Sequence, residues 1–238
     1  LAFCYDKNFV RSIAQSLNIP VPLEVYIDPA DETARLPSIF PALIKPNFGD
    51  SSIGITKNAV VHNPQELIQY IAELQKDFPH KPLLIQEFLS GTEYSVAVFG
   101  NNGNYKILPI LEVDYSDLPA DCPPILSYES KWLPESPYWQ NIKYKQAVLN
   151  DENYRQLVDY SILLFERLGC QEYGRFDFRK DENNEIKLLE VNPNPGWCWD
   201  GKMNIMAGFE NLDYSQFLEL ILEAALQRLK LKDRKTIN

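Results

Sequence analysis

Four side chains that could bind a metal ion and its anion fall on the two strands of one expected hairpin. Arg175 and Asp177 alternate with apolar residues before a polar turn, and Glu190 and Asn192 do so after it. If the turn centres on positions 183–184, Asp177 faces Glu190 across the hairpin. Arg175 then faces Asn192, and alternation places all four on one face. Two carboxylates and an amide oxygen suit Mg²⁺, and an arginine suits an anion bound to that metal.

The same alternation predicts that the opposite face of this hairpin is apolar. Its members are Phe176, Phe178, Leu189 and Val191. A surface hairpin with solvated charges is the alternative, since a slip of one residue would turn every side chain to the other face. Directly opposed carboxylates repel unless a cation neutralises them. Replacing either carboxylate is therefore expected to leave the metal-free protein about as stable or slightly more stable.

Two further segments have the composition of nucleotide-binding elements. Residues 47–54 contain two glycines and two serines, which can turn N–H groups and hydroxyls toward phosphate oxygens, although a plain turn is the alternative. Lys45 ends the apolar strand before this loop, where it needs a partner or must reach solvent. Residues 84–96 read as a strand, a glycine, Glu93 and another strand. The backbone of this segment could bind the edge of adenine, and its carboxylate could bind ribose. The alternative is two ordinary strands joined by a polar turn.

The elements that must position these residues follow from hydrophobic periodicity and turn signals. Helices are expected at residues 7–17, 64–77, 151–168 and 213–230. Strands are expected at 23–28, 42–45, 55–61, 83–89, 93–99 and 106–115, with the hairpin at 172–192. Their order suggests an α+β fold of two lobes, residues 1–105 and 106–238.

Residues 116–140 break this periodicity. They contain five prolines and predict a long segment without regular structure. Tyr128, Trp132, Tyr138 and Trp139 argue against plain disorder, because disordered segments contain few aromatic residues. We expect this segment to be mobile and to order over a bound ligand.

Composition excludes several classes of protein. The net charge of −10 argues against binding duplex nucleic acid, and no apolar run approaches the length of a membrane span. Four cysteines without a CxxC spacing, with only two histidines, disfavour a zinc site and a disulfide framework. These features predict a cytoplasmic protein. The start at Leu1, without methionine, suggests the downstream part of a longer protein.

Taken in order, these segments resemble the ATP-grasp superfamily, and more closely the D-alanine–D-alanine ligase family. The resemblance runs from Tyr5 to the last helix and depends on the joint order of its motifs. The matching stretches are Tyr5-Asp6-Lys7, Ile44-Lys45-Pro46, residues 50–54, residues 86–93, residues 128–132, Gly174-Arg175-Phe176-Asp177 and residues 189–196. The resemblance implies an ATP-grasp fold with the nucleotide in a cleft between the two lobes.

The resemblance also implies a role for each matching residue. The nucleotide-binding residues would be Lys7 and Lys45 at the phosphates, Ser51 and Ser52 over the triphosphate, Gln86, Glu87, Phe88 and Leu89 at adenine, and Glu93 at ribose. The catalytic residues would be Ser51, Lys131 near the transferred phosphoryl group, and Arg175 at the oxyanion. The metal ligands would be Asp177, Glu190 and Asn192, holding two Mg²⁺ ions, which Mn²⁺ could replace.

The implied activity is ATP-dependent joining of a small-molecule carboxylate to an amine through an acyl phosphate, with release of ADP and phosphate. The alternatives are a ligase for a larger, non-peptide acceptor, as in mycosporine ligases, or an ATP-binding module without turnover. An N-terminal substrate domain is expected upstream, and assembly into a homodimer stays open.

Two local departures from the family pattern concern the substrates. Trp132 stands where these ligases usually have a tyrosine that bonds the loop serine, and an indole N–H can only donate. Residues 197–202 replace a segment in which a serine usually receives the carboxylate of the acceptor. Trp197, Trp199, Asp200 and Lys202 would make that pocket bulkier and differently charged. The alternative is that both tryptophans belong to the core.

Overall fold

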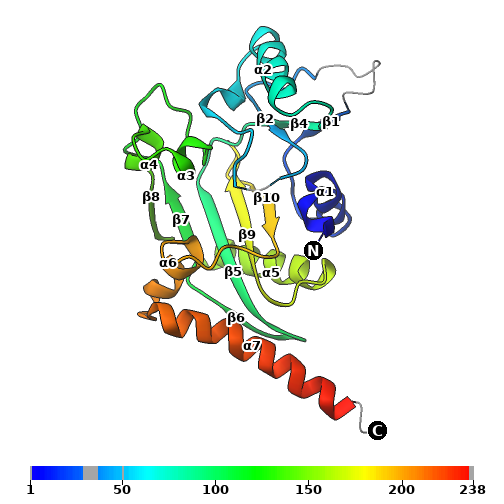
Figure 1. Ribbon diagram of the computed structural model, residues 1–238, viewed down its shortest axis with the longest axis vertical. Helices are drawn as coiled ribbons and strands as arrows, with labels where there is room; N and C mark the ends of the chain where they lie inside the picture. The colour runs from blue at the N-terminus through cyan, green and yellow to red at the C-terminus, as the bar shows by residue number, and fades with distance from the viewer. Residues whose placement is uncertain (1, 29–36, 50, 236–238) are drawn as a thin grey trace.

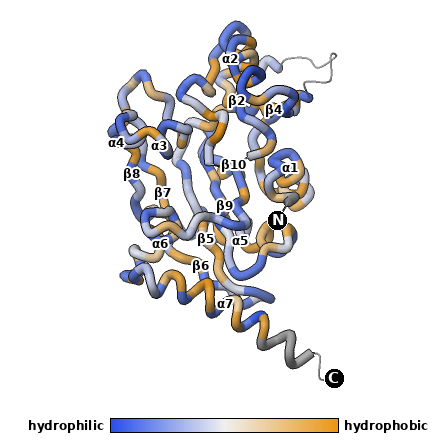
Figure 2. Tube along the Cα trace, viewed as in Figure 1, coloured by the Kyte–Doolittle hydropathy of each residue, from blue (hydrophilic) through white to orange (hydrophobic). Residues whose placement is uncertain are grey.

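The structure is a computed structural model that describes residues 2–28, 37–49 and 51–235. Two antiparallel sheets form its frame, and helices cover their faces (Figure 1). Figure 2 shows apolar residues alternating with hydrophilic ones along the coloured part of α7 (Tyr214–Lys235), as expected for a helix with one buried side. In the part of the chain that the structure describes, no helix is long and apolar enough to cross a membrane.

The smaller sheet has the strand order β1-β4-β2-β3. Its strands are β1 (Glu24–Ile27), β2 (Ala42–Pro46), β3 (Val60–Val61) and β4 (Leu83–Glu87). Helix α2 (Pro64–Asp77) packs its apolar side on one face, with Asn63 as its N-cap and Pro64 in its first turn. The bounds of this helix match the sequence prediction. The other face of the sheet, which carries Lys45 and Gln86, is turned to the second sheet.

The larger sheet has the order β10-β9-β5-β7-β8, and β6 pairs with β5. Its strands are β5 (Glu93–Asn101), β6 (Asn104–Ile107), β7 (Leu111–Asp114), β8 (Lys143–Gln146), β9 (Glu172–Lys180) and β10 (Ile186–Asn192). One face packs against α1 (Lys7–Ser16) and α5 (Asp151–Arg167). The opposite face packs against α6 (Lys202–Phe209) and α7 at one end. These two helices do not cover the other end of this face, where Glu93 and Ser95 lie, and a cavity is found there.

The division between the sheets differs from the predicted boundary near residue 105. Strand β5 lies in the centre of the larger sheet, so the chain passes from one sheet to the other between Glu87 and Glu93. The N-terminal segment, from the 3₁₀ turn η1 (Ala2–Tyr5) through α1, also packs on the larger sheet. Strands β5 and β6, on either side of the predicted boundary, form one hairpin within the larger sheet.

Several other predicted elements are corrected. The expected strand at 106–115 is split into β6 and β7, and the one at 55–61 is a 3₁₀ turn, η2 (Lys57–Ala59), followed by the short β3. Strand β8 and helix α6 were not predicted. Residues 116–140 contain α3 (Glu129–Trp132) and most of α4 (Pro137–Asn141), each too short to show a helical period.

The β9–β10 hairpin confirms the predicted pairing of Asp177 with Glu190 and of Arg175 with Asn192. The predicted turn centre is wrong, however, because Leu188 pairs with Phe178, one residue out of that register. A bulge at Leu189 restores the register before Glu190. Leu189 consequently lines the cavity instead of joining the apolar face where it was predicted.

The turn of this hairpin spans Asp181 to Glu185. The Oδ1 atom of Asp181 accepts the N–H groups of Asn183 (2.8 Å) and Glu185 (2.9 Å). Asn184 has φ 65°, the left-handed conformation that asparagine tolerates in such loops. The longer turn shifts the strand register by one residue and the bulge shifts it back. The predicted pairing of the four polar residues is therefore confirmed.

Candidate active site

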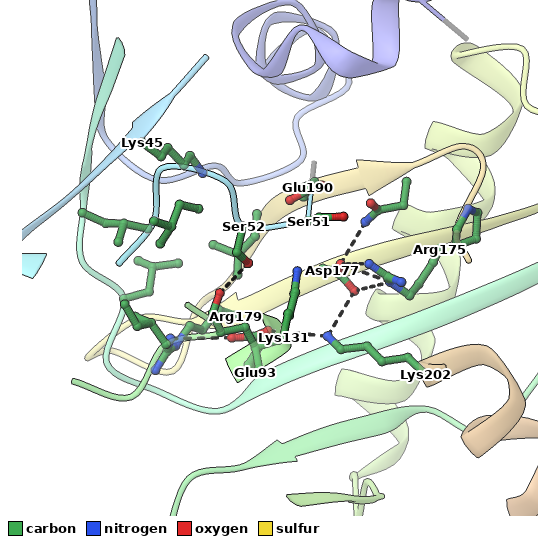
Figure 3. Close-up of a pocket in the computed structure, with 18 of the residues that line it drawn as sticks. Lys45, Ser51, Ser52, Glu93, Lys131, Arg175, Asp177, Arg179, Glu190 and Lys202 are labelled. Carbon is green, nitrogen blue, oxygen red and sulfur yellow. Dashed lines mark hydrogen bonds and ion pairs between the residues drawn. The ribbon is translucent and has the colours of Figure 1, made fainter. Parts of the chain in front are cut away.

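A cavity of about 340 Å³ lies between the two sheets (Figure 3). The smaller sheet contributes Lys45 and Gln86 to its wall, and the loops above it contribute Ser51, Ser52 and Lys131. The larger sheet contributes seven charged or polar side chains, namely Glu93, Tyr144, Arg175, Asp177, Arg179, Glu190 and Asn192. The cavity thus brings together segments that are more than 130 positions apart in the sequence.

Lys45 reaches this cavity from β2 and is only 5% exposed. Its Nζ donates to Oε1 of Gln86 (3.1 Å), and Nε2 of Gln86 donates to Oε2 of Glu24 (2.7 Å). Burial lowers the pKa of Lys45, and the Glu24 carboxylate opposes that shift. The expectation of a partner is confirmed, and the alternative of a lysine that reaches solvent is wrong.

Asp177 is the most heavily bonded carboxylate of the site. It accepts hydrogen bonds from the Arg175 guanidinium at 3.0 Å to each oxygen, from Ser95 Oγ at 2.6 Å and from Asn192 Nδ2 at 2.9 Å. Burial acts to raise the pKa of Asp177, but the charges of Arg175 and Lys202 and these hydrogen bonds hold it well below the usual range. The carboxylate is 7% exposed, so the alternative of a solvated hairpin is wrong.

This arrangement changes the expectation that Asp177 and Glu190 repel each other without metal. Arg175 already neutralises Asp177, and the Lys202 ammonium lies 3.9 Å from Oδ1. The Glu190 carboxylate has no hydrogen-bond or ion-pair partner among the described residues, although it lines the same cavity. The two carboxylates therefore differ, and replacement of Asp177 is no longer expected to be neutral for stability.

Glu93 has three partners of its own. It accepts a hydrogen bond from the Tyr115 hydroxyl (2.6 Å) and pairs with Arg179 (3.6 Å) and Lys202 (3.8 Å). The guanidinium of Arg179 lies over the rings of Phe88 (5.4 Å) and Tyr115 (5.3 Å). The sequence analysis missed Arg179, Ser95 and Tyr115. Alternation could have identified Arg179, because it follows Arg175 and Asp177 on the same strand face.

The expected adenine segment lines the cavity with all four of its residues, Gln86, Glu87, Phe88 and Leu89. The N–H groups of Glu87 and Phe88 are already bonded to the carbonyls of Leu23 and Pro41. The N–H of Leu89 has no partner among the described residues. Leu89 therefore offers the free backbone donor that a nucleobase edge requires.

The segment 125–132 contacts the loop at 47–54 through two hydrogen bonds. Ser52 Oγ donates to the Leu126 carbonyl (2.6 Å), and the Trp132 indole N–H donates to the Ser51 carbonyl (3.3 Å). Trp132 thus links the two loops through a backbone oxygen, which requires only a donor. Lys131 from this segment enters the cavity, where burial lowers its pKa and the charge of Glu190 opposes that shift.

The loop at 47–54 needs its left-handed residues. Ser51 and Ser52 have φ 55° and 59°, and Gly54 has φ 74°. A Cβ at Gly54 would lie 2.7 Å from the Pro46 ring, so only glycine fits. Asp50 of the matching stretch lies outside the described residues.

Lys7 is the one proposed nucleotide ligand that does not line this cavity. Its Nζ donates to the Gly49 carbonyl (2.6 Å), which connects α1 to the loop at 47–54. The structure therefore gives Lys7 a place beside the loop backbone. Two of the three N–H donors of the Lys7 ammonium are not used by this hydrogen bond.

The donors for a metal ion are Asp177, Glu190 and the amide oxygen of Asn192. No group of three or more His, Cys, Asp or Glu side chains suited to a metal occurs among the described residues. Two carboxylates and an amide on one cavity wall nevertheless fit Mg²⁺, which usually binds one or two carboxylates and completes its shell with water and phosphate oxygens. The residues present fit the ion that the sequence analysis expected.

Ser52→Ala is expected to loosen the segment 116–140 from the loop beneath it. The variant loses one hydrogen bond worth about 1 kcal/mol, which corresponds to a roughly fivefold larger open population. Limited proteolysis should cleave residues 116–140 correspondingly faster. Ser16→Ala is the matched control, because Ser16 bonds only within α1. Equal cleavage of Ser52→Ala and the unmodified protein would show that this bond does not hold the segment.

Comparison with known sequences places this site in a family. The family model described as D-ala D-ala ligase C-terminus matches residues 29–223. A D-alanine–D-alanine ligase of Halalkalibacterium halodurans is 29% identical over 232 residues, covering 95% of this chain and 71% of the relative. An uncharacterised protein, y4sG, of Sinorhizobium fredii is 27% identical over 228 residues, covering 94% of this chain and 63% of that protein. The chain thus spans less than two thirds of the length of y4sG.

Solved structures show the same fold. The D-alanine–D-alanine ligase of Bacillus anthracis in complex with ATP has a TM-score of 0.72 at 21% identity, covering 97% of this chain and 68% of that one. The VanG D-Ala:D-Ser ligase of Enterococcus faecalis has a TM-score of 0.71 at 24% identity, covering 94% and 62%. The expected ATP-grasp fold is confirmed. With its two sheets, the cavity between them and the matched residues 29–223, this chain belongs to the D-ala D-ala ligase C-terminus family.

Proposed function

We propose that this chain is the ATP-binding, catalytic part of an ATP-dependent carboxylate–amine ligase. The observation that carries the proposal is the single cavity that collects Lys45, Lys131 and Arg175 with the carboxylates Asp177 and Glu190. Phosphoryl transfer asks a protein mainly to position its reactants and neutralise charge, and this set of groups suits that task. Both reactants besides ATP would be small molecules.

Each wall of the cavity has a separate task in this proposal. Lys45 and the loop at 47–54 bind the phosphates, while Leu89 and Phe88 receive the adenine. Asp177, Glu190 and Asn192 would hold Mg²⁺, which supplies charge neutralisation of the phosphate oxygens when it is bound. The segment 125–132 shields the reacting atoms from water.

The proposed reaction has two steps. A carboxylate oxygen of the first substrate attacks the γ-phosphorus of ATP, ADP leaves, and an acyl phosphate forms. The amine of the second substrate attacks the acyl carbon, loses a proton, and phosphate departs as the amide forms. Lys131 neutralises the transferred phosphoryl group, and Arg175 stabilises the oxyanion of the second step.

The wall near residues 196–202 favours a second substrate larger than D-alanine. Trp197 is 46% exposed and Trp199 is 73% exposed, so the alternative that they are core residues is wrong. Gly201 and Lys202 line the cavity, and residues 197–202 contain no serine. The two tryptophans lie in the chain between Gly196 and Gly201, which line the cavity, and exposed aromatic rings in such a segment suit a bulky acceptor. A ligase for such an acceptor is therefore the second candidate function.

The test is ADP release by the protein with Mg²⁺–ATP and single or paired amino acids. Release that depends on both a carboxylate and an amine substrate is the expected result. D-alanine should be compared with larger amines to separate the two ligase candidates. Nucleotide binding, seen as a thermal shift, with no substrate-dependent ADP release would instead identify an ATP-binding module without turnover.

A further inference from the structure

Lys202 connects the two acidic groups of the larger sheet. It is the first residue of α6, and its side chain is only 10% exposed. Its Nζ donates to Ser95 Oγ (3.0 Å) and lies 3.8 Å from Glu93 Oε1 and 3.9 Å from Asp177 Oδ1. Figure 3 shows its ammonium reaching toward Asp177 from the side opposite Glu190. The sequence analysis had expected Lys202 only in the acceptor pocket.

The hydrogen bonds of Asp177 leave little room for a metal ion. A carboxylate offers about four lone-pair sites. Arg175 donates three contacts within 3.2 Å, and Ser95 and Asn192 donate one each. A divalent cation can therefore bind Asp177 only if a donor leaves or turns away. The fixed charge of Lys202, 3.9 Å from the carboxylate, also repels any such cation.

We propose that Lys202 is a positioning residue that controls metal binding at Asp177. Without metal, the Lys202 ammonium provides the positive charge beside the Asp177 carboxylate. The ammonium must move away from Asp177 before a divalent cation can bind there. Glu93 makes this movement possible, because Lys202 keeps its ion pair with Glu93 when it moves away from Asp177. The inference rests on the magnesium site of the proposed function.

One consequence is a weak affinity for metal without nucleotide. Because the charge of Lys202 opposes the cation, its removal should strengthen binding of the metal alone. Lys202→Met keeps most of the side-chain stem and removes the charge, which lies 5.8 Å from the centre of the Tyr144 ring. Asp177 retains Arg175, and Glu93 retains Arg179 and Tyr115, so no buried carboxylate is left without a partner.

The experiment measures Mn²⁺ binding without nucleotide, by the electron paramagnetic resonance signal of free Mn²⁺. Lys202→Met and Lys202→Gln should each bind Mn²⁺ at least ~10-fold more tightly than the unmodified protein, because a like charge about 4 Å from the site is removed. Lys202→Arg keeps the charge and should stay within ~3-fold. Lys106→Met is the control for loss of a lysine elsewhere, since Lys106 pairs with Glu210 at the surface. Melting midpoints establish that each variant is folded.

Two results would overturn the inference, and both leave the proposed function to be tested separately. Equal Mn²⁺ affinity in all folded variants would show that Lys202 does not control the metal. Absence of Mn²⁺ binding in every variant would show that the carboxylates bind no metal before nucleotide arrives, and it would not bear on a metal that binds together with nucleotide phosphates. Substrate-dependent ADP release still tests the ligase proposal by itself.

Discussion

Asp177→Asn is expected to lower the free energy of unfolding of the metal-free protein by ~3 kcal/mol, because it removes one partner of a buried ion pair. Arg175 and Lys202 hold the folded pKa of Asp177 below that of the unfolded chain. Such a carboxylate stabilises the fold at every pH above its unfolded pKa of about 4, and the contribution is lost as the pH falls through the folded pKa. The full effect is therefore present at pH 7. This expectation replaces the one derived from repulsion between Asp177 and Glu190.

Urea unfolding at pH 7 without divalent metal measures this effect. Asp159→Asn is the matched control, because Asp159 is exposed on α5 and its replacement should change stability by less than about 0.5 kcal/mol. Asp177→Asn should also reduce substrate-dependent ADP release by at least ~100-fold, since it removes a charged group from the site of phosphoryl transfer. A variant as stable and as active as the unmodified protein would contradict the assignment of this face of the hairpin.

Arg175→Ala is expected to separate nucleotide binding from amide formation. The guanidinium is aimed into the cavity and held by three contacts to Asp177, while Lys45, the proposed phosphate ligand, lies on the opposite wall. Nucleotide should therefore still raise the melting midpoint of Arg175→Ala. Amide formation should fall by roughly 10²–10³-fold, the usual cost of removing one donor from an oxyanion site. Parallel measurements of thermal shift and amide product check both parts.

Arg175→Lys tests whether the fork of the guanidinium is needed as well as its charge. Lysine cannot bond Asp177 through two nitrogens and also face the cavity, so most of the activity should stay lost. Arg167→Ala is the control for loss of an exposed arginine, at the end of α5. Loss of the nucleotide-induced shift in Arg175→Ala would instead make Arg175 a nucleotide ligand.

The sequence indicated the longer helices and the face of the hairpin because these depend on local patterns. Pro64 at the first turn and helical periodicity predicted the bounds of α2 from residues within the helix itself. Alternation over neighbouring residues placed Arg175, Asp177, Glu190 and Asn192 on one face. The assumed turn opposed them correctly only because the bulge offset the error in its centre. The bulge at Leu189 was not visible in the sequence, since a bulge leaves the composition of a strand unchanged.

Tertiary structure alone decided how the charges of the site are shared. Ser95 meets Asp177 across 82 positions of sequence, and Lys202 meets Ser95 across 107, so no local pattern could pair them. The placement of β5 in the larger sheet brought Glu93 to Arg179 and Lys202. The sequence by itself thus indicated most of the loop and hairpin residues that line the cavity, because alternation and periodicity are properties of neighbours, but it missed Arg179, Ser95 and Tyr115. Which carboxylate is neutralised, and by which cation, was decided only when the sheets packed and buried those charges together.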